Sequence, residues 1–97
     1  MQAASAWIEN SSMRAKVTVV TVHRARGLRV VIFLDDHEPA HVHVFGDGQA
    51  KINLAGAAGA PELVWVDGMK HGDVRRAMQL VAAEQVHLLA RWRGIHG

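Results

Sequence analysis

Residues 41–54 read HVHVFGDGQAKINL, a stretch in which two alternating segments flank the turn sequence Gly-Asp-Gly at 46–48. Successive side chains of a strand point to opposite faces of a sheet, so this stretch predicts a β-hairpin. A register that puts the apolar residues of both strands on one face is favoured, because a slip of one residue would bury half of the polar set, and the Gly-Asp-Gly turn gives such a register. The cross-strand pairs of that register are Phe45–Gln49, His43–Lys51 and His41–Asn53. We therefore expect one apolar face and one polar face, which carries both histidines, the lysine and the asparagine.

Strand-like sequence also lies on both sides of this hairpin. Residues 16–22 and 28–34 are rich in β-branched side chains and predict two strands joined by a short loop. Residues 62–66 predict a further strand. Residues 1–14 show no sustained periodicity, so we expect a flexible N-terminal tail before a single domain at 15–97.

Helical periodicity follows these strands, in residues 71–93. Apolar side chains recur there about every 3.6 residues, which predicts one helix with a single apolar face. Gln85 falls within that face, where its amide must find a hydrogen bond, and we expect Trp65 and Trp92 to pack in the core. The predicted fold is α+β: a small antiparallel β-meander of four to five strands with one C-terminal helix packed on one face.

The composition excludes several classes of protein. The chain has 97 residues, enough for one domain with little stability to spare, so a partner or self-association as a homo-oligomer would stabilise it. It has no cysteine, which excludes disulfides, thiol nucleophiles and cysteine zinc sites. Its serines are Ser5, Ser11 and Ser12, which excludes a serine hydrolase built inside the domain. No apolar run is long enough to span a membrane and no secretory leader is recognisable, so we expect a cytoplasmic protein without membrane attachment.

Positive charge is concentrated in one part of the chain. Five cations occur with no acidic residue between positions 11 and 34: Arg14, Lys16, Arg24, Arg26 and Arg29. Basic clusters attract nucleic acid or acidic proteins, although a solvated surface produces the same pattern. We expect Arg24, Arg26 and Arg29 to attract the backbone of a nucleic acid. The formal net charge of +2 leaves out seven histidines, so protonation near neutral pH would raise it strongly.

The polar face of the predicted hairpin admits three interpretations. In the first, it is a general acid–base site, because histidine accepts and donates protons near neutral pH and Lys51 can neutralise a phosphate. Cleavage of RNA at its own 2′-hydroxyl needs a base, an acid and a cation, and it needs no metal. A lysine close to His43 also lowers the pKa of that histidine and keeps it available as a base.

The second interpretation is a metal site, in which His41 and His43 chelate zinc or another transition metal. The third ligand is then His37, Asp35 or Asp36, and the all-histidine set is His37, His41 and His43. The lysine on the neighbouring strand opposes this interpretation, because a cation beside a dication is repelled unless it serves the substrate.

The third interpretation is structural. Asp36 or Glu38 holds a ring nitrogen of His41, and the histidines and acids cap the loop through hydrogen bonds. The loop then offers a shaped surface to a partner protein.

The chain combines Gly27 before a strand, the sequence DHEPAHVH at 36–43 and the sequence GQAKI at 48–52. This combination resembles the bacterial family called domain of unknown function 4160, over about residues 16–96. The chain departs from the family pattern at Ala40, where a second proline is common. The resemblance implies a small protein encoded beside another small protein, an arrangement interpreted as a toxin–antitoxin pair. It therefore implies a cognate protein partner and favours RNA or translation as the target.

From these observations we expect one component of a toxin–antitoxin-like pair that acts on RNA as a metal-independent ribonuclease, without a cofactor. The expected roles are His41 and His43 as the acid–base pair, Lys51 as the phosphate contact, Asn53 to orient the substrate, and Asp36 or His37 to hold a histidine. The alternatives are a non-enzymatic, antitoxin-like module that binds a partner, and a histidine-ligated metal-binding protein.

Overall fold

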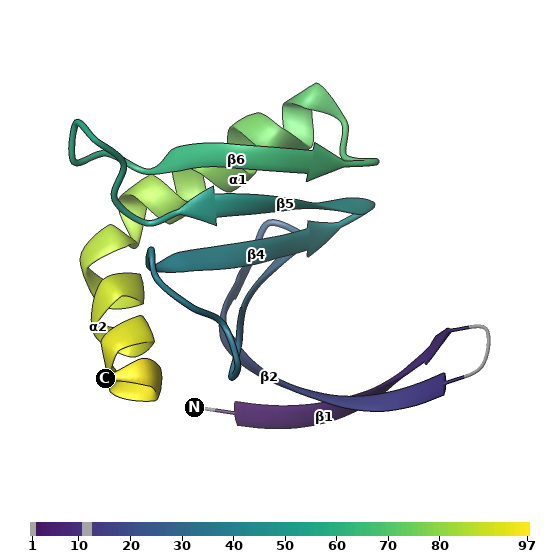
Figure 1. The fold of residues 1–97 in the computed structure, drawn as a ribbon. Coiled ribbons are helices and arrows are strands. Elements are labelled where there is room, and N and C mark those ends of the chain that lie inside the picture. Colours follow the sequence, from purple (N-terminus) through teal and green to yellow (C-terminus); the bar gives the residue numbers. More distant parts are fainter. Residues whose placement is uncertain (1, 11–12) are drawn as a thin grey trace.

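The computed structural model describes residues 2–10 and 13–97, which form six strands and two helices (Figure 1). The strands are β1 (Gln2–Asn10), β2 (Met13–Ala25), β3 (Leu28–Phe33), β4 (His41–Gly46), β5 (Gly48–Asn53) and β6 (Glu62–Asp67). The helices are α1 (His71–Ala83) and α2 (Gln85–His96). Among the described residues, neither helix has the length and the apolar character that a membrane crossing requires.

The strands form one antiparallel sheet in the order of the sequence, β1-β2-β3-β4-β5-β6. This arrangement confirms the predicted α+β meander and places residues 62–67 in the same sheet as the rest. The sequence predicts a tail over residues 1–14, whereas the structure describes β1 at 2–10, paired with the first half of β2. An edge strand needs only backbone partners, which the 13-residue β2 supplies, so side-chain periodicity does not reveal it. Residues 1, 11 and 12 lie outside the described residues.

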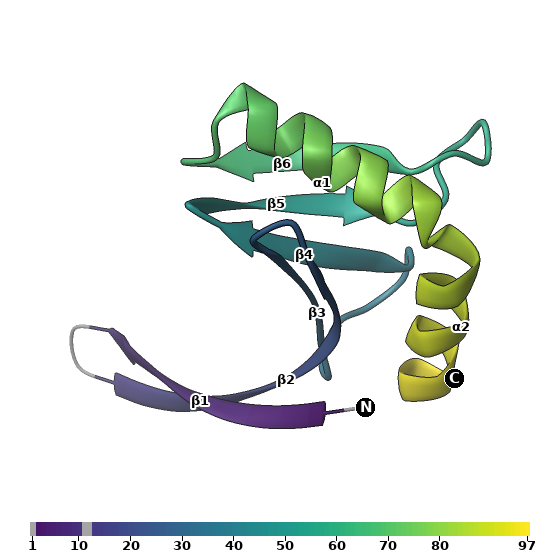
Figure 2. The ribbon, with the colours of Figure 1, turned by 180° about the vertical axis from the view of Figure 1, so that it is seen from behind.

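The hydrophobic core lies between the sheet and the two helices (Figure 2). Helix α1 packs against β5 and β6, while α2 turns away from α1 at its end. The core side chains of the central strands are Val30, Ile32, Val42, Val44, Ala50 and Ile52, and those of the helices are Ala77, Leu80, Val81, Leu88 and Trp92. Burial of each large aliphatic side chain contributes about 1.5–3 kcal/mol, so this layer fixes which face of the β4–β5 hairpin remains outside. Trp92 is only 3% exposed, which confirms its predicted place in the core.

The C-terminal helix is not continuous as predicted, since it is broken at Glu84. The backbone of Glu84 has φ −106° and ψ 16°, which lies outside the helical range. The Nε2 amide of the next residue, Gln85, donates hydrogen bonds of 2.7 Å to the carbonyls of Leu54 and Gly59. These two bonds confirm the expected role of Gln85 and fasten the bend to the loop after β5. Periodicity alone does not reveal such a bend, because it depends on a loop 26 to 31 residues earlier.

Candidate functional site

The candidate site lies on the face of β4 and β5 that is turned away from the helices. The β4–β5 register is the predicted one, with His41 opposite Asn53 and His43 opposite Lys51. The alternation that buries Val42 and Ile52 in the core therefore presents the histidines on the other face. Strand β6 continues this face by placing Trp65 opposite Lys51.

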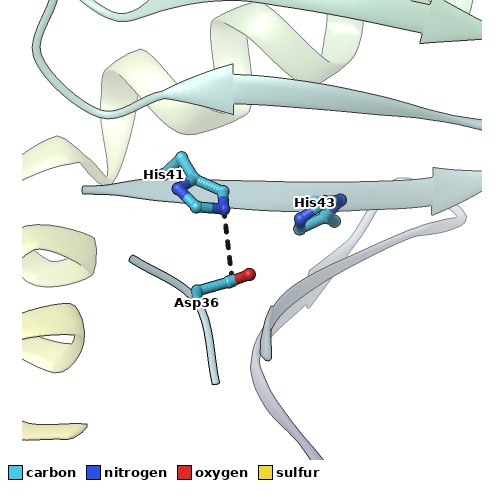
Figure 3. Close-up of side chains that lie close together, drawn as sticks. All are labelled: Asp36, His41 and His43. Atoms are coloured by element: carbon cyan, nitrogen blue, oxygen red, sulfur yellow. Dashed lines mark ion pairs between the residues drawn. The ribbon is translucent and has the colours of Figure 1, made fainter. Parts of the chain in front are cut away.

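A turn before β4 brings Asp36 to this face. The Asp36 backbone N–H donates to the Phe33 carbonyl at 3.2 Å, and the Phe33 N–H donates to Asp36 Oδ2 at 3.1 Å. These two bonds close the turn and fix the carboxylate. Asp36 Oδ2 then lies 3.2 Å from His41 Nε2, the ion pair drawn as a dashed line in Figure 3. Of the three residues predicted to hold a histidine, Asp36, His37 and Glu38, the structure gives this contact to Asp36.

His41 is held from both sides of its ring. Its Nδ1 lies 2.8 Å from the Pro39 carbonyl oxygen, and its Nε2 faces Asp36. Only 4% of the residue is exposed to solvent. This geometry therefore does not favour an acid–base role for His41, because both ring nitrogens face protein groups and the ring is buried.

His43 has a different environment. Its ring lies edge-on to Phe33, His41 and Trp65, at centroid distances of 4.6, 5.3 and 5.9 Å. Its buried Nδ1 has no hydrogen-bond partner among the residues that the structure describes. Burial lowers the pKa of His43 to about 4, although Asp36 acts to raise it, and the charges of His41 and Lys51 lower it further. The predicted direction of the Lys51 effect is confirmed, but desolvation is the larger cause, and His43 is neutral at pH 7.

The other predicted site residues divide into two groups. Lys51 and His37 line one open pocket of about 300 Å³ together with Asp36, His41 and His43. Asn53 lies beside His41 in the register but does not line this pocket, and its Oδ1 is buried without a partner among the described residues.

The groups able to bind a metal form a smaller cluster within that pocket. One ligand atom each from Asp36, His41 and His43 lies within 4.8 Å of the others. Of the third ligands considered, His37, Asp35 and Asp36, the described residues place Asp36 in the cluster with His41 and His43. The turn at Phe33–Asp36 brings the aspartate carboxylate toward β4.

Trp65 is the site residue that the sequence analysis placed wrongly. It was expected in the core, but 39% of it is exposed and its ring lies against His43. The β5–β6 register shifts between Lys51 and Ile52, and β6 is the last strand of the sheet. The only sequence signal was its place in a five-residue strand, and an unpredicted bulge decides which side of the sheet such a residue faces.

The predicted arginines lie at the β2–β3 hairpin. Arg24 is directly opposite Arg29 in the register, and both line an open pocket of about 640 Å³ with Arg26 and Phe45. The Arg29 guanidinium carbon lies 5.5 Å from the centre of the Phe45 ring. Because Arg29 is also opposite Phe45 in the β3–β4 register, the two share the face that carries His43. The side chains of Arg29 and Phe45 thus continue the sheet face of the histidine pocket, while the arginine pocket extends from them past Asp47 to Asp73 and Arg76 of α1.

Comparison with known proteins places this architecture in a family. A search of curated proteins and a search of solved structures each gave no match. A family model matches residues 27–93, which include β3 to β6, α1, most of α2 and every residue of the histidine pocket. The chain therefore belongs to the family described as Domain of unknown function (DUF4160).

Proposed function

We propose that this protein is one component of a toxin–antitoxin-like pair and that it binds single-stranded RNA on the sheet face opposite the helices. The observation that carries the proposal is the alternation of aromatic rings and cations across this face. Arg29 lies over Phe45 on β3 and β4, and Lys51 lies opposite Trp65 on β5 and β6.

The aromatic side chains supply the stacking surface that such binding needs. Trp65 is 39% exposed, and its ring lies against that of His43. Phe33 lies on the same face against His43, and Phe33 and Phe45 are half-buried with their ring centroids 6.5 Å apart. A base stacked on an aromatic side chain contributes about 1–3 kcal/mol, and any base can stack. This favours unpaired bases over a duplex, in which the base faces are hidden.

The cations supply the contacts to phosphate. Arg24 and Arg29 are direct cross-strand neighbours, and like charges in that position destabilise a sheet. A bound phosphate would relieve this repulsion by lying between the two guanidinium groups. Lys51 extends the positive charge to the histidine pocket.

Binding is proposed here in preference to the cleavage expected from the sequence. Cleavage at a 2′-hydroxyl needs an acid and a base that both reach the substrate. His43 is neutral at pH 7 and suits a base, but His41 is buried, with its Nδ1 bonded to the Pro39 carbonyl and its Nε2 facing Asp36. The geometry therefore supports an RNA-binding face more strongly than a two-histidine nuclease.

The test is fluorescence anisotropy of a short labelled single-stranded RNA, titrated with wild type, Trp65→Ala and Arg24→Ala/Arg29→Ala. We expect each variant to bind at least about tenfold more weakly than wild type, because a stack or two phosphate contacts are lost. Arg75→Ala is the matched control, since Arg75 is an exposed cation on α1, on the helical side. Equal affinity of all four proteins, or no binding by wild type at low salt, would exclude the proposal.

A second candidate function, binding of the cognate small protein, is favoured by strand β6. This strand ends the sheet, and four consecutive apolar residues on it are 39–44% exposed: Leu63, Val64, Trp65 and Val66. An exposed apolar edge accepts a strand from another chain. If the neighbouring small protein adds a strand there, Val64→Lys will abolish its co-purification while His37→Ala leaves it unchanged. Co-purification that survives Val64→Lys would exclude this edge.

A further inference from the structure

We propose that Asp36, His41 and His43 form a three-ligand binding site for a divalent transition-metal ion, with zinc as the first candidate. This inference does not rest on RNA binding, because it concerns three ligand atoms within the histidine pocket. Figure 3 shows the three side chains converging, two from β4 and one from the turn that follows β3.

The hydrogen bond between His41 and Pro39 determines which ring nitrogen carries the proton. A carbonyl oxygen only accepts hydrogen bonds, so the contact with Pro39 requires the proton of a neutral ring to be on Nδ1. The lone pair of Nε2 then points at Asp36 Oδ2, which is also an acceptor. Two buried acceptors 3.2 Å apart repel each other unless a cation or an added proton lies between them. Histidines that bind metals commonly show this pattern, with one nitrogen on the metal and the other donating to a backbone carbonyl.

The spacing of these two atoms fits a metal ion. Zinc binds histidine nitrogen and carboxylate oxygen at about 2.0–2.2 Å with tetrahedral angles, so its ligand atoms are about 3.3 Å apart. The observed distance between His41 Nε2 and Asp36 Oδ2 is 3.2 Å. The separation of these two atoms therefore matches that of two ligand atoms on one zinc ion.

His43 supplies the third ligand. It lies two residues along β4 on the same face, and its ligand atom is within 4.8 Å of the other two. Its buried Nδ1 lacks a partner among the described residues, and its ring is held by aromatic edges and not by hydrogen bonds. A rotation of this ring must shorten the remaining distance for all three ligand atoms to bind one ion.

The surroundings of the cluster suit a site with one open position. Asp36 is fixed by the Phe33 N–H and His41 by Pro39, so two ligands are held before the ion arrives. The same pocket contains Lys51. An anionic ligand that completes the coordination would meet the Lys51 ammonium group, which explains how a lysine is accommodated beside a dication. Three ligands of nitrogen and oxygen with an open position are typical of zinc and related ions.

The experiment uses the full chain, stripped with a chelator and titrated with Co²⁺ and with Zn²⁺ alone. We expect one equivalent of Co²⁺ to produce the strong visible absorption of a four-coordinate site, and Zn²⁺ to displace it. Asp36→Asn and His43→Gln should each weaken binding at least about tenfold. These two residues are less buried than His41, and circular dichroism will confirm that the variants remain folded.

The matched control removes two exposed histidines of the helices, His71→Gln/His87→Gln, and should bind the metal as wild type does. The inference is overturned if wild type binds no stoichiometric metal, because His41 is then a protonated clamp between two acceptors. It is equally overturned if this double variant loses binding, or if folded Asp36→Asn and His43→Gln bind as tightly as wild type. RNA affinity that is unchanged in the metal-free protein would leave the proposed function intact, so the two proposals can fail separately.

Discussion

The two parts of the sheet face are built in opposite ways. At the histidine end, the polar side chains are covered and held by the backbone: His41 by Pro39 and Asp36 by Phe33. At the arginine end, Arg24 and Arg29 face each other across two strands and line an open pocket. At the histidine end, the ligand atoms are held in place before any ligand binds. At the arginine end, the neighbouring positive charges favour the binding of an anion. Substitutions at each end test this difference.

The largest effect is expected from His41→Ala. The substitution removes both contacts of a side chain in a residue that is only 4% exposed, and it leaves the Asp36 carboxylate with the Phe33 N–H alone. We expect the free energy of unfolding to fall by about 1–3 kcal/mol, measured by urea denaturation. The control is the exposed His37→Ala, which should change stability by less than about 0.5 kcal/mol. Similar losses of unfolding free energy in the two variants would show that the contacts of His41 do not stabilise the protein.

The second effect concerns the salt dependence of RNA binding. Each phosphate contact to a single strand contributes about 0.7 to the slope of log affinity against log salt concentration. Arg24→Ala/Arg29→Ala should therefore lower that slope by about 1.4, whereas Trp65→Ala should lower affinity with little change of slope. Anisotropy titrations at three salt concentrations measure both quantities. An unchanged slope in the double arginine variant would mean that these residues do not contact phosphate.

A smaller effect is expected on stability at the arginine end. Because Arg24 and Arg29 are like charges in direct opposition, Arg24→Ala should stabilise the free protein by about 0.2–1 kcal/mol at low salt. The gain should disappear as salt concentration rises, since exposed charges are screened. Thermal unfolding at two salt concentrations checks this, and destabilisation at low salt would contradict it.

A further effect is expected from the pH dependence of the metal-free protein. Burial lowers the pKa of His43 in the folded state to about 4, below its ordinary value of 6.5. Between these values the unfolded chain binds a proton that the folded chain does not, so stability should decrease as pH falls from 6.5 toward 4. His43→Gln should reduce this decrease, as urea denaturation at several pH values would reveal. An equal decrease in both proteins would assign the effect to other groups.

The sequence predicted the parts that local patterns determine. Alternation within 41–54 and the Gly-Asp-Gly turn were sufficient to predict the β4–β5 register, because a slip of one residue buries polar residues. The side of the sheet on which His43 and Lys51 lie followed from the same pattern.

Features that depend on distant contacts could not be predicted. The helix bends at Glu84, where Gln85 is bonded to the distant loop after β5. Trp65 faces His43 because of a bulge in the β5–β6 ladder, and Asp36 reaches His41 because a turn closes on Phe33. None of these contacts leaves a periodic signal in the chain.

The central claim, that the sheet face away from the helices is the binding face, has an internal reference in its tryptophans. Trp65 lies on that face with 39% exposure, and Trp92 is 3% exposed beneath the helices. Titration of ¹⁵N-labelled protein with single-stranded RNA, followed through the indole N–H resonances, compares both in one sample. We predict that the Trp65 resonance shifts in proportion to bound RNA while that of Trp92 stays in place. A Trp65 resonance that does not move when RNA is bound would contradict the account.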